Sequence, residues 1–238
     1  VLARRLGITP WAGVSVALSP GLLYAVTADT SEPLGVALLG LALLSYLDRR
    51  WVWTGICLTA LCLTKEVFVL IPITLIGWSL WRRRDRDMGA ALAALAAAPV
   101  VFGLWQLYLF VRFDEWALLS SPEIITTPLK GWWDAIAIAS GFGVGGVETA
   151  QLGQAALPLI VAVGAALIFG IVRASRMRFF LDPIYLGLAL LTFCLSPLGV
   201  LYPKDLFRLT ATLFLLLPAI LLGPRDEGID TEVAEAGA

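Results

Sequence analysis

The sequence contains no histidine, so neither a histidine general base nor a histidine metal ligand is present in these 238 residues. Charged residues are also scarce. They make up 15% of the chain, against roughly 25% in soluble domains. The three cysteines, Cys57, Cys62 and Cys194, all lie in apolar runs, and an odd number in such surroundings does not form a disulfide framework. We interpret them as small packing residues.

Apolar residues are present in excess. They account for 59% of the sequence, against roughly 45–50% in soluble domains, and the mean hydropathy is +0.87. A helix needs about 20 apolar residues to cross the hydrocarbon core of a bilayer, and fewer where its end residues reach the headgroups. The sequence therefore predicts an all-α, polytopic bundle of about eight transmembrane helices. The predicted spans are residues 11–27, 33–47, 51–64, 67–81, 88–111, 156–172, 179–200 and 209–222.

The loops between these spans alternate between two kinds, one basic and the other acidic or mixed. Of the 17 lysines and arginines, 12 fall in the basic kind. Basic loops of membrane proteins face the cytoplasm, so we predict that the two kinds lie on opposite sides of a membrane. The predicted cytoplasmic segments are 4–5, 48–50, 82–87 and 173–178, and the predicted external segments are 29–32, 65–66, 112–155 and 202–208.

The longest external segment contains a further predicted helix. Residues 129–140 (LKGWWDAIAIAS) place Trp132, Trp133 and Ile136 near one helical face, which is typical of a helix lying in the membrane interface. Residues 141–146 (GFGVGG) match the dinucleotide-binding pattern G-x-G-x-x-G, but no predicted strand precedes them, as that binding site requires. We interpret them as a flexible hinge.

The domain organisation follows from the last span. We assign residues 1–223 to one transmembrane helical domain. Residues 224–238 are acidic and rich in small residues, a composition that cannot bury enough apolar surface to fold. They are therefore predicted to form a disordered cytoplasmic tail.

Chemistry is predicted at the external face, because the cytoplasmic loops are too short to hold a catalytic domain. A carboxylate there would serve as general base, and a lysine or arginine at headgroup depth would bind a phosphate carried on a lipid. Lys65 and Glu66 form the tip of a tight hairpin between the third and fourth spans. Two interpretations of this tip are open: a solvated Lys65–Glu66 pair, or charged groups that face a cavity.

Two consecutive segments carry a recurring pattern: TADTSEPLGVALLGLALLSYLDRR and WVWTGICLTALCLTKEVFVLIPI. An external acid, Asp29 or Glu32, begins a helix at Pro33-Leu34. The basic turn Arg49-Arg50 follows, and the next helix ends in the tip Leu63-Thr64-Lys65-Glu66. This pattern resembles the GT-C class of membrane glycosyltransferases, which includes polyprenyl-phosphate-sugar mannosyltransferases and aminoarabinose transferases. The likeness covers residues 10–80 well and the rest loosely, with residues 116–136 and 202–208 similar to external segments of bacterial members.

The resemblance implies an enzyme that moves a sugar from a polyprenyl-phosphate donor to a glycan, lipid or protein acceptor at the external face, within cell-envelope glycan assembly. It implies a bacterial or archaeal plasma membrane, no nucleic-acid partner and no evident cofactor, with a divalent metal left open. The implied site residues are Asp29 and Glu32 as catalytic acids, Lys65, Lys204 and Arg208 as donor-phosphate ligands, and Glu66 and Arg112 on the rim.

One departure from the family is important. Its principal catalytic acid lies in an external loop upstream of the matched region, and this chain has no counterpart. We therefore expect the sequence to be an N-terminally truncated fragment of the enzyme, which contributes the accessory part of the active-site rim.

Two other classes of function remain open. A transporter or flippase would show inverted repeats and ionisable groups near the middle of its spans. No convincing repeat is present, and Asp182 precedes Pro183 near a cytoplasmic helix start, where an acid is favoured by the helix dipole. A non-catalytic membrane assembly subunit would use the small residues 90–98 as a helix-packing surface, although any polytopic bundle contains such a surface.

The predicted topology is tested by labelling single cysteines in a variant that lacks the three native ones. A membrane-impermeant reagent added from outside should label a cysteine at Glu66 and should not label one at Arg84, because the two positions belong to loops of opposite kind. Permeabilised cells serve as the control, in which both positions should react. Labelling at Arg84 in intact cells would overturn the topology.

Overall fold

The structure is a computed structural model that describes residues 1–9, 11, 14, 18–27, 30–82, 87–114, 116, 126–141 and 147–222. The regular elements among these residues are helices, which confirms the all-α prediction for the part of the chain described. They are α1 (Leu2–Arg5), α3 (Pro20–Thr27), α4 (Glu32–Leu47), α5 (Trp51–Thr64), the 3-10 helix η1 (Glu66–Val69), α6 (Leu70–Arg82), α7 (Met88–Phe113), α8 (Lys130–Ala139), α9 (Val147–Ala174), α10 (Leu181–Phe193), α11 (Pro197–Leu201) and α12 (Pro203–Leu222).

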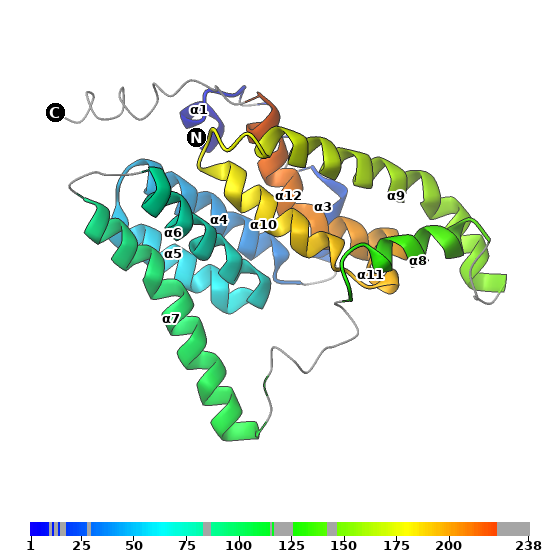
Figure 1. Cartoon of the computed structure of the whole chain (residues 1–238), viewed down its shortest axis with the longest axis horizontal. Coiled ribbons are helices and arrows are strands. Elements are labelled where there is room, and N and C mark those ends of the chain that lie inside the picture. The colour runs from blue at the N-terminus through cyan, green and yellow to red at the C-terminus, as the bar shows by residue number, and fades with distance from the viewer. Residues whose placement is uncertain are drawn as a thin grey trace.

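The helices form three neighbouring groups (Figure 1). Helices α4 to α7 gather on one side, α3, α10 and α12 lie in the middle, and α8, α9 and α11 lie on the other side. Contacts of α10 with α6 and of α12 with α9 join the groups. The C-terminal half of α7 extends beyond its neighbours.

Two predicted boundaries differ from the observed ones because prolines start new helices there. The seventh predicted span is interrupted, because the backbone of Ser196 before Pro197 is extended and α11 starts afresh at that proline. Residues 203–208, predicted as an external loop, are instead the first turns of α12, which starts at Pro203, a residue preorganised for the first helical position.

Helix α9 starts at Val147, well before the predicted span at Ala156. Hydropathy shows only where the apolar residues begin, whereas the hydrogen-bonded helix extends further toward the N-terminus. Of the predicted hinge at residues 141–146, only Gly141 is described, and the predicted tail at 224–238 lies outside the described residues.

Two helices in the described part of the chain are long and apolar enough to cross a membrane: α7, Met88–Phe113, and the stretch Ala156–Ala174 of α9. Their most apolar windows are only 22% and 28% buried in the structure. A helix that is apolar all round is buried in a core or in a membrane, so most of the apolar surface of α7 and α9 has no protein cover here. The helices α4, α5, α6 and α10 are apolar but shorter.

The predicted cytoplasmic segments meet at one end of the bundle, which we name the basic end. The Arg5 guanidinium lies 3.0 Å from the Asp48 carboxylate, and that of Arg49 lies 3.9 Å from Asp87. These two ion pairs connect the N-terminal segment, the α4–α5 turn and the α6–α7 turn. The three segments therefore lie on the same side of the bundle, as the charge pattern requires.

Tyr46 at the end of α4 extends the basic end to a fourth segment. Its fully buried ring packs on Phe180, just before α10, with 5.3 Å between ring centroids, and its hydroxyl lies 3.3 Å from the Ser79 hydroxyl of α6. At the end of α9, Arg173 donates to the carbonyl of Leu221 at 3.4 Å, which brings the end of α12 to the same side.

The predicted interfacial helix is confirmed as a helix, α8, but its tryptophans do not share a face. Trp132 is 6% exposed and packs into the core, while Trp133 is 73% exposed. Adjacent residues of a helix point about 100° apart, so one side of α8 packs on α9 and α11, and of the two tryptophans only Trp133 faces away from these helices. The membrane-interface position of α8 stays a prediction.

Helices α9 and α10 approach each other closely at a glycine. A Cβ added to Gly170 would collide with the hydroxyl and ring of Tyr185. Tyr185 is completely buried, so the ring has no free space into which to retreat. Gly170 therefore sets the distance between these two helices.

We predict that Gly170→Ala lowers the free energy of unfolding by about 1–3 kcal/mol, the usual effect of forcing extra volume into a packed core. Gly103→Ala in α7 is the matched control, because a Cβ there meets nothing within 4 Å. It should leave the stability unchanged or raise it by up to about 1 kcal/mol through helix propensity. Thermal unfolding of both variants in detergent measures the difference, and equal midpoints would contradict the close contact.

Candidate functional site

The chain turns sharply at Lys65, the single residue between α5 and η1. Helix α5 ends at Thr64, whose hydroxyl donates to the carbonyl of Leu61 at 2.7 Å. Lys65 itself has an extended backbone, with φ −162° and ψ 131°. Helix α5 starts at the α4–α5 turn of the basic end and runs away from it, so Lys65 lies at the opposite end of the bundle.

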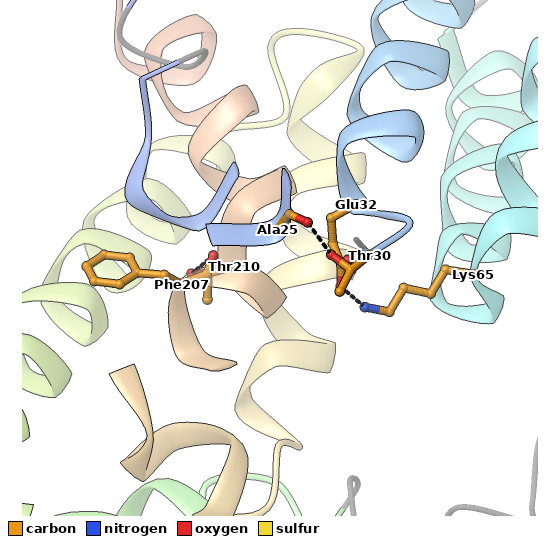
Figure 2. A network of polar contacts seen from close by, with 6 residues as sticks. All are labelled: Ala25, Thr30, Glu32, Lys65, Phe207 and Thr210. Atoms are coloured by element: carbon orange, nitrogen blue, oxygen red, sulfur yellow. Dashed lines mark hydrogen bonds and ion pairs between the residues drawn. The ribbon is translucent and has the colours of Figure 1, made fainter. Parts of the chain in front are cut away.

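Lys65 forms an ion pair with Glu32, the first residue of α4 (Figure 2). Its Nζ lies 2.8 Å from Oε1 of Glu32, and the side chains are only 21% and 7% exposed. Glu66, the alternative partner, is exposed on η1. The solvated Lys65–Glu66 pair considered for the hairpin tip is thus wrong, and the partner of Lys65 lies 33 residues earlier in the chain.

Glu32 is held at this position by the start of its helix. An acid in the first turn is stabilised by the helix dipole, and Pro33 begins the apolar run behind it. The preceding Thr30 donates its hydroxyl to the carbonyl of Ala25 at the end of α3 (3.1 Å; Figure 2). The junction of α3 and α4 is therefore fixed next to the ion pair.

The environment of Glu32 favours its ionised form. Burial by itself would raise the pKa of this carboxyl, but the hydrogen bond from Lys65, together with its positive charge, outweighs that influence. The pKa of Glu32 consequently lies below its ordinary value. At neutral pH the pair is a carboxylate with an ammonium.

The ion pair stands in the wall of a cleft that is partly open to solvent and has a cavity volume of about 50 Å³. Four structural elements form the walls: the start of α4, the α5–η1 tip, the C-terminal half of α10 and α12. Polar lining residues are Glu32, Lys65, Thr192 and Thr212, and apolar ones are Val67, Phe68, Leu188, Leu191, Leu195 and Leu213. The cleft is therefore mostly apolar, with one charged pair and two hydroxyls.

The α10 wall of the cleft is held by residues 126–132, which lead into α8 and include its first three residues; we name this segment the strap. The last carbonyls of a helix have no partner within the helix. Here Thr126 N–H donates to the carbonyl of Cys194 (2.7 Å), Leu129 N–H to that of Phe193 (2.8 Å) and the indole of Trp132 to that of Thr192 (2.9 Å).

A glycine makes this docking possible. A Cβ at Gly131 would collide with the carbonyl of Leu195, so only glycine allows α8 to approach the end of α10 so closely. Leu129, just before α8, has a positive φ of 67°, which is a strained conformation for a non-glycine residue. The strap is thus fitted closely to the cleft wall.

The structure brings together two of the residues predicted for the site, Glu32 and Lys65. Glu66 and Arg112 do not line the cleft, and Arg112 is exposed at the end of α7 beside the Phe113 ring. Asp29 lies outside the described residues.

Lys204 and Arg208 belong to the first turns of α12, and their side chains are outside the described part. Thr192 and Thr212, which also line the cleft, were not predicted from the sequence. The available signal was a hydroxyl within an apolar run, and such residues also occur inside helices without any ligand.

The described residues contain no group of three or more cysteine, aspartate and glutamate side chains close enough to share a metal ion. No protein-family model, no curated protein and no solved structure matches this chain. The resemblance to GT-C glycosyltransferases therefore remains a prediction that rests on the residues themselves.

We predict that Lys65→Met alone lowers the free energy of unfolding by about 1.5–3 kcal/mol, because it leaves the Glu32 carboxylate buried without its cation. The double variant Lys65→Met/Glu32→Gln should recover most of this loss. Unfolding of the two single variants and the double variant in detergent gives the coupling free energy.

The Lys130–Asp134 pair of α8 provides the matched control. Its atoms are also 2.8 Å apart, but the side chains are 62% and 34% exposed. Exposed pairs contribute at most about 1 kcal/mol, so Lys130→Met should have little effect. Equal coupling at the two pairs would mean that burial does not strengthen the Glu32–Lys65 interaction.

Proposed function

We propose that the chain is the helical core of a membrane glycosyltransferase whose sugar donor is a polyprenyl phosphate, and that the cleft at Glu32 and Lys65 holds the donor headgroup. The observation that carries this proposal is a buried lysine–glutamate pair in the wall of a cleft whose other walls are mostly leucine. An amphipathic ligand with one anionic group and a hydrocarbon chain matches both parts of that surface.

The exposed apolar surface supports a multi-pass membrane position. Large side chains such as Leu104, Val111 and Val161 are more than half exposed on α7 and α9. Contiguous surface of this kind marks contact with lipid or another protein. A bilayer would cover it, with the basic end in the cytoplasm. The cleft then opens at the external headgroup level.

The charge of Lys65 fits a phosphate on a lipid. An ammonium group has three N–H donors, and Lys65 gives one to Glu32. A phosphate arriving in the cleft would accept another. Since Leu191, Leu195 and Leu213 exclude water from the neighbouring walls, such a charge-assisted contact is stronger than it is in bulk water.

The proposed reaction is an inverting transfer. An acceptor hydroxyl attacks the anomeric carbon, the bond from that carbon to the phosphate oxygen breaks, and polyprenyl phosphate leaves with the bonding electrons. A carboxylate takes the hydroxyl proton, and the positive charge of Lys65 stabilises the leaving phosphate. The lowered pKa of Glu32 makes it a weak base, so Glu32 holds Lys65 in place and Asp29 is the better candidate for a proton acceptor in this chain.

The test uses the full-length protein with the double variant Glu32→Gln/Lys65→Gln, which removes both charges and leaves no unpaired ion. The KM for a polyprenyl-phosphate sugar should rise about ten- to a hundredfold, the worth of one lost charge-assisted hydrogen bond. Asp29→Asn should instead lower kcat, because an acid near the acceptor does not hold the phosphate.

Lys130→Gln/Asp134→Asn is the control, because it removes an exposed pair of the same geometry. It should leave both kinetic constants unchanged. A transfer assay at equal protein levels separates these cases. If the Glu32→Gln/Lys65→Gln variant has the wild-type KM and kcat, the assignment of the donor site to the cleft is wrong.

A further inference from the structure

Two threonines on α12 differ in how their hydroxyls are bonded. Thr210 is completely buried, and its Oγ1 donates to the carbonyl of Leu206 at 2.6 Å, one turn earlier in its own helix (Figure 2 shows its longer contact to the Phe207 carbonyl). Such bonding to the preceding turn is the usual arrangement of a threonine inside a helix. It leaves the Thr210 hydroxyl with no donor for a ligand.

Thr212 is different. It is 8% exposed and lines the cleft, but its hydroxyl makes no hydrogen bond with any residue that the structure describes. Thr192 on the facing α10 also lines the cleft, and its hydroxyl donates to the carbonyl of Leu188 at 2.9 Å. Thr212 is therefore the hydroxyl of the described cleft wall whose donor is available.

Among the described residues, the Thr212 hydroxyl is not one of the polar side-chain atoms that are both buried and without a partner, so it keeps contact with the open space of the cleft. Water satisfies such a hydroxyl, and a ligand that displaces this water without replacing its hydrogen bond loses affinity. A ligand group that accepts a hydrogen bond is therefore favoured beside Thr212. The same cleft carries Lys65, so the expected partner is an anionic oxygen.

We propose that the Thr212 hydroxyl donates a hydrogen bond to a phosphate oxygen of the ligand in this cleft. This inference rests on the proposed donor site and adds a residue from α12 to it. The electrostatic attraction between Lys65 and a phosphate depends little on direction, whereas the hydroxyl of a helical residue donates its hydrogen bond along one direction. Thr212 is then a binding residue that fixes the orientation of the phosphate between α12 and the α5–η1 tip.

The experiment measures binding of a polyprenyl phosphate without sugar to the full-length protein in detergent, by titration calorimetry. Thr212→Val should raise the Kd about ten- to a hundredfold, as expected for a lost hydrogen bond to a charged group. Thr212→Ser keeps the hydroxyl and should retain the wild-type Kd within a few-fold. Thr210→Val is the matched control and should leave the Kd unchanged.

Thermal unfolding of the ligand-free variants separates binding from folding. Thr212→Val should leave the unfolding midpoint nearly unchanged, because the hydroxyl that it removes faces the cleft and makes no hydrogen bond with the described residues. Thr210→Val should lower the midpoint, because it removes a hydrogen bond that the folded protein makes. A lowered midpoint for Thr212→Val, with an unchanged Kd, would mean a structural role and overturn the inference.

The remaining outcomes identify the failing step. An equal Kd in wild type and Thr212→Val overturns the Thr212 contact and leaves the donor site standing. A loss seen with the sugar-bearing donor and absent with polyprenyl phosphate overturns it in favour of a sugar contact. Binding of inorganic phosphate as tightly as polyprenyl phosphate would make the ligand a free anion. If the wild-type protein binds no polyprenyl phosphate, the donor site and this inference fall together.

Discussion

The ion pair between Glu32 and Lys65 joins the start of α4 to the end of α5 at the end of the bundle opposite its basic turns. Two charges taken out of water are unfavourable unless each has a partner of opposite sign close by. The 2.8 Å contact meets that requirement, and it fixes the position of the α5–η1 tip relative to α3 and α4. The cleft, the apolar walls around it and the donor role proposed for it all depend on this placement.

The two ends of the bundle use charge differently. At the basic end, arginines pair with exposed or partly exposed acids such as Asp48 and Asp87, and such pairs contribute little to stability. At the cleft end, within the described residues, the Glu32–Lys65 pair is mostly buried, and its neighbours are leucines and threonines. The first arrangement suits a surface that is fully solvated, and the second suits a surface that exchanges water for a ligand.

The helices could be predicted from the sequence because apolar runs of sufficient length, interrupted by charged turns, leave few alternatives to helices. The starts of α4, α5 and α7 were placed within a residue or so by Pro33, Trp51 and Met88. Less could be predicted where position depends on packing. Trp132 and Trp133 are equivalent in sequence, and only the contact of α8 with α9 and α11 decides which one is buried.

The candidate site shows the same division. Lys65 was recognised from its place at a hairpin tip, but its partner could not be chosen, because Glu66 is adjacent in sequence and Glu32 is adjacent only in space. Thr212 could not be found at all. A hydroxyl in an apolar helix usually bonds to its own backbone, as Thr210 does, and the exception is visible only when the cleft around it is known.

The strap has a consequence for how the cleft communicates with the exterior. Residues 126–132 satisfy the carbonyls at the end of α10, and that end of the helix carries Leu191 and Thr192 into the cleft wall. Displacing the strap therefore deprives the wall of three hydrogen bonds. Linkage is reciprocal, so under the proposed donor role any molecule that binds only the displaced strap would weaken donor binding by the same factor by which the donor weakens binding of that molecule. An antibody fragment that binds only the displaced strap would thus act as an antagonist of the proposed donor without entering the cleft.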